Sequence, residues 1–106
     1  MRSVGQGTQG TVTGSDEDPR VAHLRAAVSR LRRELAAHPA EFTDRGIAED
    51  ELAALAEMAH GGTPEVLRMR RSLLLVAGAI GSVSALAAGL AGVRGAVEGF
   101  GEKGGG

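Results

Sequence analysis

Residues 72–93 read SLLLVAGAIGSVSALAAGLAGV, an uncharged run of twenty-two residues on which the fold depends. Arg68, Arg70 and Arg71 stand before this run, and Arg94 follows it. A run of this length and composition has to leave water, either in a protein core or in a lipid bilayer. The organisation of the rest of the chain follows from which of the two environments it enters.

The composition of the whole chain points to one small helical domain. The chain has 106 residues, two aromatic residues (both Phe) and no cysteine, so its core must be built from aliphatic side chains and holds no disulfide. Because a small aliphatic core buries little area, we expect self-association. A net charge of −1 argues against nucleic acid as a partner. The N-terminus has no apolar segment of the kind found in signal peptides, so a cytoplasmic protein is expected.

Two amphipathic helices are predicted ahead of the apolar run. Asp18 as N-cap and Pro19 at the first helical position predict a helix over about 19–38. Its apolar residues recur at spacings of three and four: Val21, Leu24, Val28, Leu31 and Leu35. The same pattern predicts a second helix over about 47–60, with an apolar face of Ala48, Leu52, Leu55 and Ala59.

The third helix contains the apolar run, and we expect it to continue unbroken over about 64–99 after a start at Thr63-Pro64. A heptad pattern predicts that its core-facing residues include Leu73, Val76, Ile80, Val83 and Leu90. A second apolar strip consists of Leu67, Leu74, Leu86, Val93 and Val97. The opposite face carries the small residues Gly78, Ser82, Ala85 and Gly89, which favour the close approach of another helix. The alternative is a break near 78–82, which gives four short helices.

The predicted fold is therefore an all-α bundle of three helices, or four if the break occurs, within a single domain over 18–100. The Gly/Thr-rich residues 1–17 and the Gly-rich residues 101–106 are expected to be disordered tails, because they have almost nothing to bury.

Protein core is the favoured environment for the apolar run. Only nine of its twenty-two residues are Leu, Ile or Val, and these supply roughly −3 to −5 kcal/mol towards bilayer insertion. Neither end of the run carries the Trp or Tyr that is typical of a membrane interface. The alternative is a single-pass inner-membrane protein that spans 72–93 with a cytoplasmic N-terminus and a cytosolic helical hairpin.

No motif in the sequence predicts catalysis, a metal site or a cofactor. The three histidines (His23, His38 and His60) are scattered, and no nucleophile–base pair can be named. The adjacent acids Glu49, Asp50 and Glu51 point in different directions on a helix and do not converge. The cluster Arg30, Arg32 and Arg33 is interpreted as a solvated face, with an anion or an acidic partner as the alternative.

Three segments carry a resemblance to a known family: RLRRELAAHP, DRGIAEDELAALAEMA and RRSLLLVAGAIGSVSAL. They resemble a family of small uncharacterised proteins from actinobacteria over about residues 19–100. The resemblance implies a domain of unknown function and transfers no site residues.

The function expected from the sequence is that of a non-enzymatic, self-associating helical interaction module, which binds another copy or another helical protein. Its helix-packing residues are expected to be Leu24, Val28, Leu31, Leu35, Leu52, Leu55, Leu73, Val76, Ile80, Val83 and Leu90. Besides the single-pass alternative, a second alternative is a signalling adaptor that polymerises through residues 4–14, where a Gly-Thr pattern repeats imperfectly.

Overall fold

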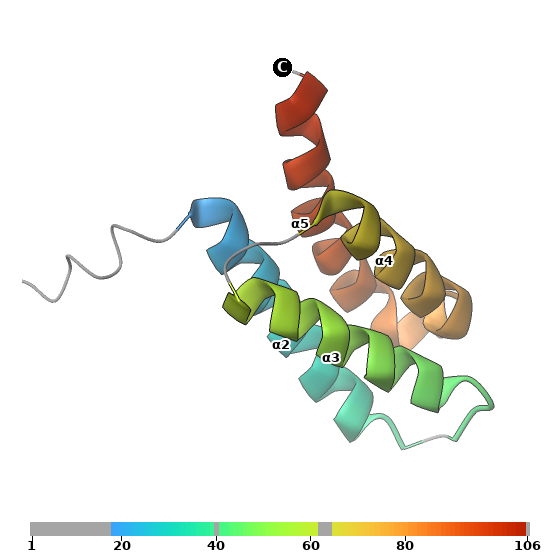
Figure 1. Ribbon diagram of the computed structural model, residues 1–106. Coiled ribbons are helices and arrows are strands. Elements are labelled where there is room, and N and C mark those ends of the chain that lie inside the picture. The colour runs from blue at the N-terminus through green and yellow to red at the C-terminus, as the bar shows by residue number, and fades with distance from the viewer. Residues whose placement is uncertain (1–17, 40, 62–64, 106) are drawn as a thin grey trace, which may run out of the picture.

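The structure, a computed structural model, describes residues 18–39, 41–61 and 65–105, and these form an all-α bundle (Figure 1). Its helices are α2 (Pro19–Ala37), α3 (Arg45–Gly61), α4 (Val66–Ile80) and α5 (Ala87–Gly105), with a short 3-10 turn, η1 (Ser84–Leu86), before α5. Each helix packs against two others, because α2 and α4 both lie against α3 and α5. The all-α prediction is confirmed in its four-helix form.

The helix α2 begins where the sequence predicted. Asp18 is the N-cap, and its side chain accepts a hydrogen bond from the backbone N–H of Arg20, with Pro19 at the first helical position. The Arg20 guanidinium also donates to the Asp18 carboxylate at 2.8 Å, which lowers the pKa of Asp18 below its ordinary value. A negative charge is favourable here because it faces the positive end of the helix dipole.

The hydrophobic core occupies the space between the four helices. The predicted faces of α2 and α3 are buried throughout, and they meet the buried face of α4 and α5. Of the expected helix-packing residues, only Val83 is half-buried, and the others are buried. Among the residues that the structure describes, the core includes one polar side chain, that of Ser72, which is 4% exposed.

The expectation of one unbroken third helix is wrong. The helix α4 ends at Ile80, Val83 is extended, and α5 returns along the bundle in the opposite direction (Figure 1). A continuous helix of about 36 residues would reach about 54 Å, nearly twice the length of the 19-residue α2. By reversing direction, the chain brings Leu86, Val93 and Val97 into the same core as α4.

The reversal passes through Gly81, whose backbone is right-handed helical, with φ −61° and ψ −24°. The glycine is required by close approach, because a Cβ added here would overlap the carbonyl oxygen of Ala77. That oxygen accepts the hydrogen bond that ends α4, from the Gly81 N–H at 2.8 Å. The turn therefore uses the absence of a side chain at Gly81.

The expected strip of small residues does not form one packing surface. Gly78, Ser82 and Ala85 are exposed, and only Gly89 is buried. A Cβ added at Gly89 would overlap the Glu34 carboxylate and lie 2.9 Å from Cδ1 of Leu31, so close approach is confined to the contact between α2 and α5. The break after Ile80 leaves Gly78 in α4, Ser82 and Ala85 in the connection, and Gly89 in α5.

The connection between α2 and α3 is held by Arg45, at the start of α3. Its guanidinium donates to the backbone carbonyls of Leu35 and His38 at the end of α2, with a distance of 3.0 Å to His38. The Leu35 carbonyl also accepts the backbone N–H of His38 at 3.1 Å, so the arginine adds to the cap at the end of α2. This explains why α3 begins at Arg45, before the predicted start at Ile47.

Two predictions concern the ends of the domain. The helix α5 continues to Gly105, beyond the predicted helix end at about residue 99, while the disorder expected for residues 101–106 stays a prediction. Phe100 is buried near this end, and the guanidinium of Arg20 lies 5.0 Å from its ring centre, which anchors the last part of α5 to α2. The expected tail over 1–17, and with it the polymerising segment 4–14, lies outside the described residues.

The beginning of α4 differs in part from the prediction. The expected start at Thr63-Pro64 lies outside the described residues, and the described helix begins at Val66 after Glu65 as N-cap. None of the helices in the described part of the chain combines the length and the apolar character that a bilayer crossing needs. Residues 72–93, which the alternative interpretation placed across a bilayer as one helix, are divided between α4 and α5.

Candidate functional site

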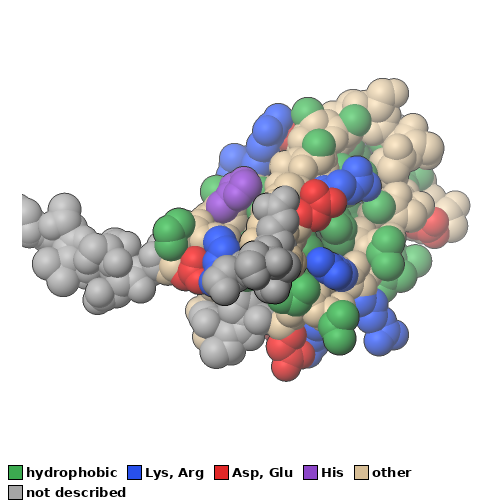
Figure 2. Space-filling model, turned by 90° about the horizontal axis from the view of Figure 1, so that it is seen from above, with side chains coloured by type: hydrophobic (Ala, Val, Ile, Leu, Met, Phe, Trp, Pro, Cys, Tyr) green, Lys and Arg blue, Asp and Glu red, His purple; other side chains and the backbone are tan. Residues whose placement is uncertain are grey.

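The outer side of α4 carries leucines that are exposed to solvent. Leu67 is 82% exposed and Leu74 is 71% exposed. They lie seven residues apart, which places them on one face two turns apart. Leu75, 42% exposed, lies beside them on the side nearer to α3. Figure 2 shows, from above, hydrophobic side chains that reach the surface beside Lys and Arg side chains.

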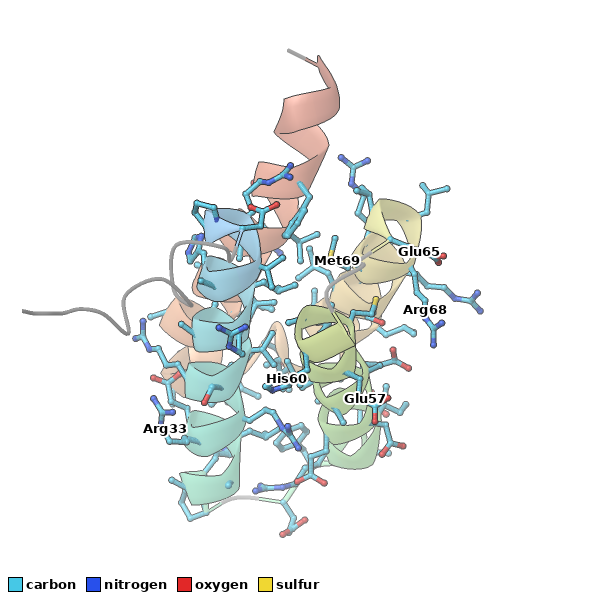
Figure 3. All side chains as sticks on the ribbon, turned by 60° about the vertical axis from the view of Figure 1, so that its left-hand side comes forward. Arg33, Glu57, His60, Glu65, Arg68 and Met69 are labelled. Atoms are coloured by element: carbon cyan, nitrogen blue, oxygen red, sulfur yellow. The ribbon has the colours of Figure 1, made fainter. Side chains whose placement is uncertain are left out.

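The charges on α3 and α4 are of opposite sign. On α3, Asp50 and Glu57 are exposed on the outer side, while α4 exposes Arg68 and Arg71. In Figure 3, Glu57 and Arg68 lie on the same side of the two helices, away from α2. They both line one shallow hollow between α3 and α4. We call this surface the α3–α4 face, defined by Asp50, Ala54, Glu57, Leu67, Arg68, Arg71, Leu74 and Leu75.

A partly buried hydrogen bond joins the two helices of the α3–α4 face. The hydroxyl of Ser72 in α4 donates to the Glu51 carboxylate of α3 at 2.8 Å. Both residues line a hollow of about 650 Å³, together with Leu67, Arg71 and Leu75 among others. This bond helps to hold the acidic helix and the basic helix side by side.

The three adjacent acids of α3 do not converge, as the sequence predicted. Glu49 accepts a hydrogen bond from Arg45 at 3.3 Å, Glu51 accepts one from Ser72, and Asp50 is exposed. Across the described ranges, no group of three or more His, Asp or Glu side chains is placed to hold a metal ion.

Sequence reasoning placed Leu67 and Leu74 in a second packing strip together with Leu86, Val93 and Val97. The structure divides that strip: the last three residues are buried in α5, while the two leucines of α4 are exposed. The division is caused by the reversal of the chain at residues 81–83. The sequence did contain a sign of this exposed surface, namely the second apolar strip, whose α4 part is left exposed to solvent once the helix breaks.

Comparison with known proteins supplies a family. A family model described as "Family of unknown function (DUF5955)" matches residues 13–101. The chain belongs to the DUF5955 family. The predicted membership of a family of unknown function is thereby confirmed, while the actinobacterial origin stays a prediction. No curated protein and no solved structure matches the chain.

The DUF5955 match includes α2, α3 and α4 in full and most of α5, so it takes in the whole α3–α4 face. Because the family has no assigned function, an account of what this chain does rests on its own residues.

Proposed function

We propose that this DUF5955 protein is a non-enzymatic helical interaction module that associates with a second copy of itself through the α3–α4 face. The observation that carries the proposal is the exposure of Leu67 and Leu74 on one side of α4. Removing a leucine side chain from water contributes about 1.5–3 kcal/mol. A large apolar surface with charged residues around it is typical of a protein–protein interface.

Charge complementarity favours a second copy as the partner. The exposed charges of α3 on this face are acidic, and those of α4 are basic. A two-fold axis that runs along the helices, in the plane of the face, sets α3 of each copy against α4 of the other. Asp50 and Glu57 then oppose Arg68 and Arg71 of the second copy, while the exposed leucines of each α4 pack against α3 of the other copy. A two-fold axis perpendicular to the helices, in the plane of the face, would instead set α3 of one copy against α3 of the other, and acids would then oppose acids.

Replacing both outer leucines of α4 with glutamine tests the apolar part of this interface. Leu67→Gln/Leu74→Gln is expected to weaken self-association at least about tenfold, because each copy loses two leucines from the buried surface. Light scattering coupled to size exclusion, over a range of loading concentrations, measures the change. Glutamine has a helix propensity similar to that of leucine, so the helicity of α4 is expected to stay unchanged.

A matched control places the same two glutamines on another helix. Ala26 and Ala37 are exposed on α2, and Ala26→Gln/Ala37→Gln is expected to associate as the wild type does. Equal association by all three proteins would refute a role for the α4 leucines. A wild type that stays monomeric at millimolar concentration would refute self-association itself.

Charge reversal tests the relative orientation of the two copies. Arg68→Glu is expected to weaken association, because the new carboxylate opposes the acids of α3 in the second copy. Adding Glu57→Arg to the same chain is expected to restore association, since the two positions exchange sign on both copies. Sedimentation velocity at low ionic strength measures both variants. If Arg68→Glu associates as strongly as the wild type, or if the double variant stays as weak as the single one, the orientation is wrong.

A further inference from the structure

We infer that Ile47 of α3 and Leu75 of α4 anchor the association of two copies, because the two residues of each copy form one apolar cluster across the two-fold axis. The inference rests on the proposed function and deepens it, since it names the residues that meet and the register in which they meet. Ile47 lies outside the set that defines the α3–α4 face. Among the described residues, it is the one large hydrophobic side chain outside α4 that is exposed, at 46%.

A hydrogen bond between side chains sets the register of α3 against α4. The Ser72 hydroxyl donates to the Glu51 carboxylate at 2.8 Å, so these two residues lie at the same level of the bundle. Ile47 precedes Glu51 by four residues, and Leu75 follows Ser72 by three, so each shares a flank of its helix with the bonded residue. These steps correspond to about 6 Å and about 4.5 Å along the two helix axes.

The opposite directions of α3 and α4 bring the two apolar residues to one level. Both steps lead towards the same end of the bundle, because α3 and α4 are antiparallel (Figure 1). Ile47 and Leu75 therefore lie on either side of the line along which the two helices meet. Leu75 lines the hollow that Glu51 and Ser72 also line, and it is 42% exposed. In the single chain, a large part of both apolar side chains thus stays in contact with water.

This position makes the pair self-complementary. A two-fold axis that runs along the helices keeps each residue at its level and exchanges α3 with α4. Ile47 of each copy then opposes Leu75 of the other, so apolar side chains meet apolar side chains next to the axis and leave water. Leu67 has no such counterpart, because it lies eight residues, or about 12 Å, from Leu75, near the level of Ala54 and Glu57.

The alternative symmetry predicts different contacts. A two-fold axis perpendicular to the helices sets α3 against α3 and α4 against α4. Ile47 would then oppose α3 of the second copy, and Leu75 would oppose α4. The identity of the residue that meets Ile47 therefore distinguishes the two arrangements.

Replacing Ile47 tests its part in the association. Ile47→Gln is expected to weaken self-association at least about tenfold, because both copies lose an apolar side chain from the cluster. Glutamine has at least the helix propensity of isoleucine, so the helicity of α3 is expected to stay unchanged by circular dichroism. Ile47→Leu keeps an apolar side chain and is the matched control, which is expected to associate about as the wild type does. Equal association of Ile47→Gln and the wild type would overturn the inference.

Disulfide formation between two single-cysteine variants tests the pair directly, because the natural chain contains no cysteine. Ile47→Cys labelled with heavy nitrogen is mixed with unlabelled Leu75→Cys in a glutathione redox buffer, and mass spectrometry identifies mixed and like-with-like disulfides. A disulfide requires Cα atoms within about 7 Å of each other. We therefore expect the mixed disulfide in excess of random pairing. Leu67→Cys in place of Leu75→Cys is the control, and it is expected to give no such excess.

Light scattering of the wild type at the same concentrations separates the inference from the proposed function. A wild type that stays monomeric would refute both. A wild type that dimerises while the mixed disulfide of Ile47→Cys and Leu75→Cys does not exceed random pairing would overturn the inference alone. The same holds if Leu67→Cys forms the mixed disulfide as readily as Leu75→Cys does, because the register would then be wrong.

Discussion

Leu31→Ala is expected to lower the free energy of unfolding by about 2–5 kcal/mol. Leu31 is fully buried in α2, and its Cδ1 atom approaches α5 beside Gly89. Removing three carbons therefore opens a cavity where α2 meets α5. Because a small domain is stable by only about 5–15 kcal/mol, the variant is expected to melt far below the wild type. Urea unfolding followed by circular dichroism measures the difference.

The same substitution at an exposed leucine is the control for this core contact. Leu67 is 82% exposed, so Leu67→Ala is expected to change the unfolding free energy of dilute protein by no more than about 0.5 kcal/mol. An unchanged melt for Leu31→Ala would contradict the placement of α2 in the bundle.

Gly89→Leu is expected to have the second-largest effect, a loss of about 1–3 kcal/mol or more of folding free energy from overpacking. The position is buried, and an added Cβ already overlaps the Glu34 carboxylate and lies 2.9 Å from Cδ1 of Leu31. Glu34 can swing aside, but Leu31 is held in the core, so a leucine would push α2 and α5 apart.

Gly78→Leu is the matched control, because Gly78 belongs to the same predicted strip of small residues as Gly89. Gly78 is exposed in α4, and an added Cβ meets nothing within 4 Å. Leucine also has a higher helix propensity than glycine, so this variant is expected to be as stable as the wild type or more stable, by up to about 1 kcal/mol. Thermal melts of both variants compare them directly, and equal melting temperatures would place residues 78 and 89 in equivalent environments, contrary to the structure.

Local sequence patterns were enough to predict α2 and α3. The Asp18-Pro19 start and the spacing of Leu24, Leu31 and Leu35 depend on residues within a few turns of one another, and the structure buries the whole predicted stripe. The predicted start of α3 was two residues too late, because Arg45 joins that helix through hydrogen bonds to the end of α2.

The reversal at residues 81–83 could not be decided from local pattern. In an Ala/Gly-rich helix, a glycine is compatible with close packing and with a turn, and the periodicity of the apolar residues continues on both sides. The deciding quantity is global: α2 and α3 have 19 and 17 residues, so they match a 15-residue α4 and leave no partner for a longer helix. The exposure of Leu67 and Leu74 follows from that reversal.

The residues that line the groove between α2 and α3 could also be predicted only in part from the sequence. The sequence identifies an arginine cluster at 30–33, but the register of α2 assigns its members to different flanks. Arg32 joins Arg25 beside α3, whereas Arg30 pairs with Glu34 elsewhere. His60 lines the groove only because α3 packs along α2, so its position there could not be predicted from the sequence.

The central claim is that the α3–α4 face is covered by a second copy, and the solvent exposure of the methyl groups of two leucines tests it most directly. A soluble paramagnetic agent broadens the methyl resonances of Leu67 and Leu74 when these side chains face solvent. As protein concentration rises and the mass doubles from 10.8 kDa, the broadening at both leucines is expected to fall, while the methyl resonance of the exposed Ala26 on α2 stays equally affected. Undiminished broadening at Leu67 and Leu74 in the doubled species would contradict the claim, because the second copy would then cover another surface.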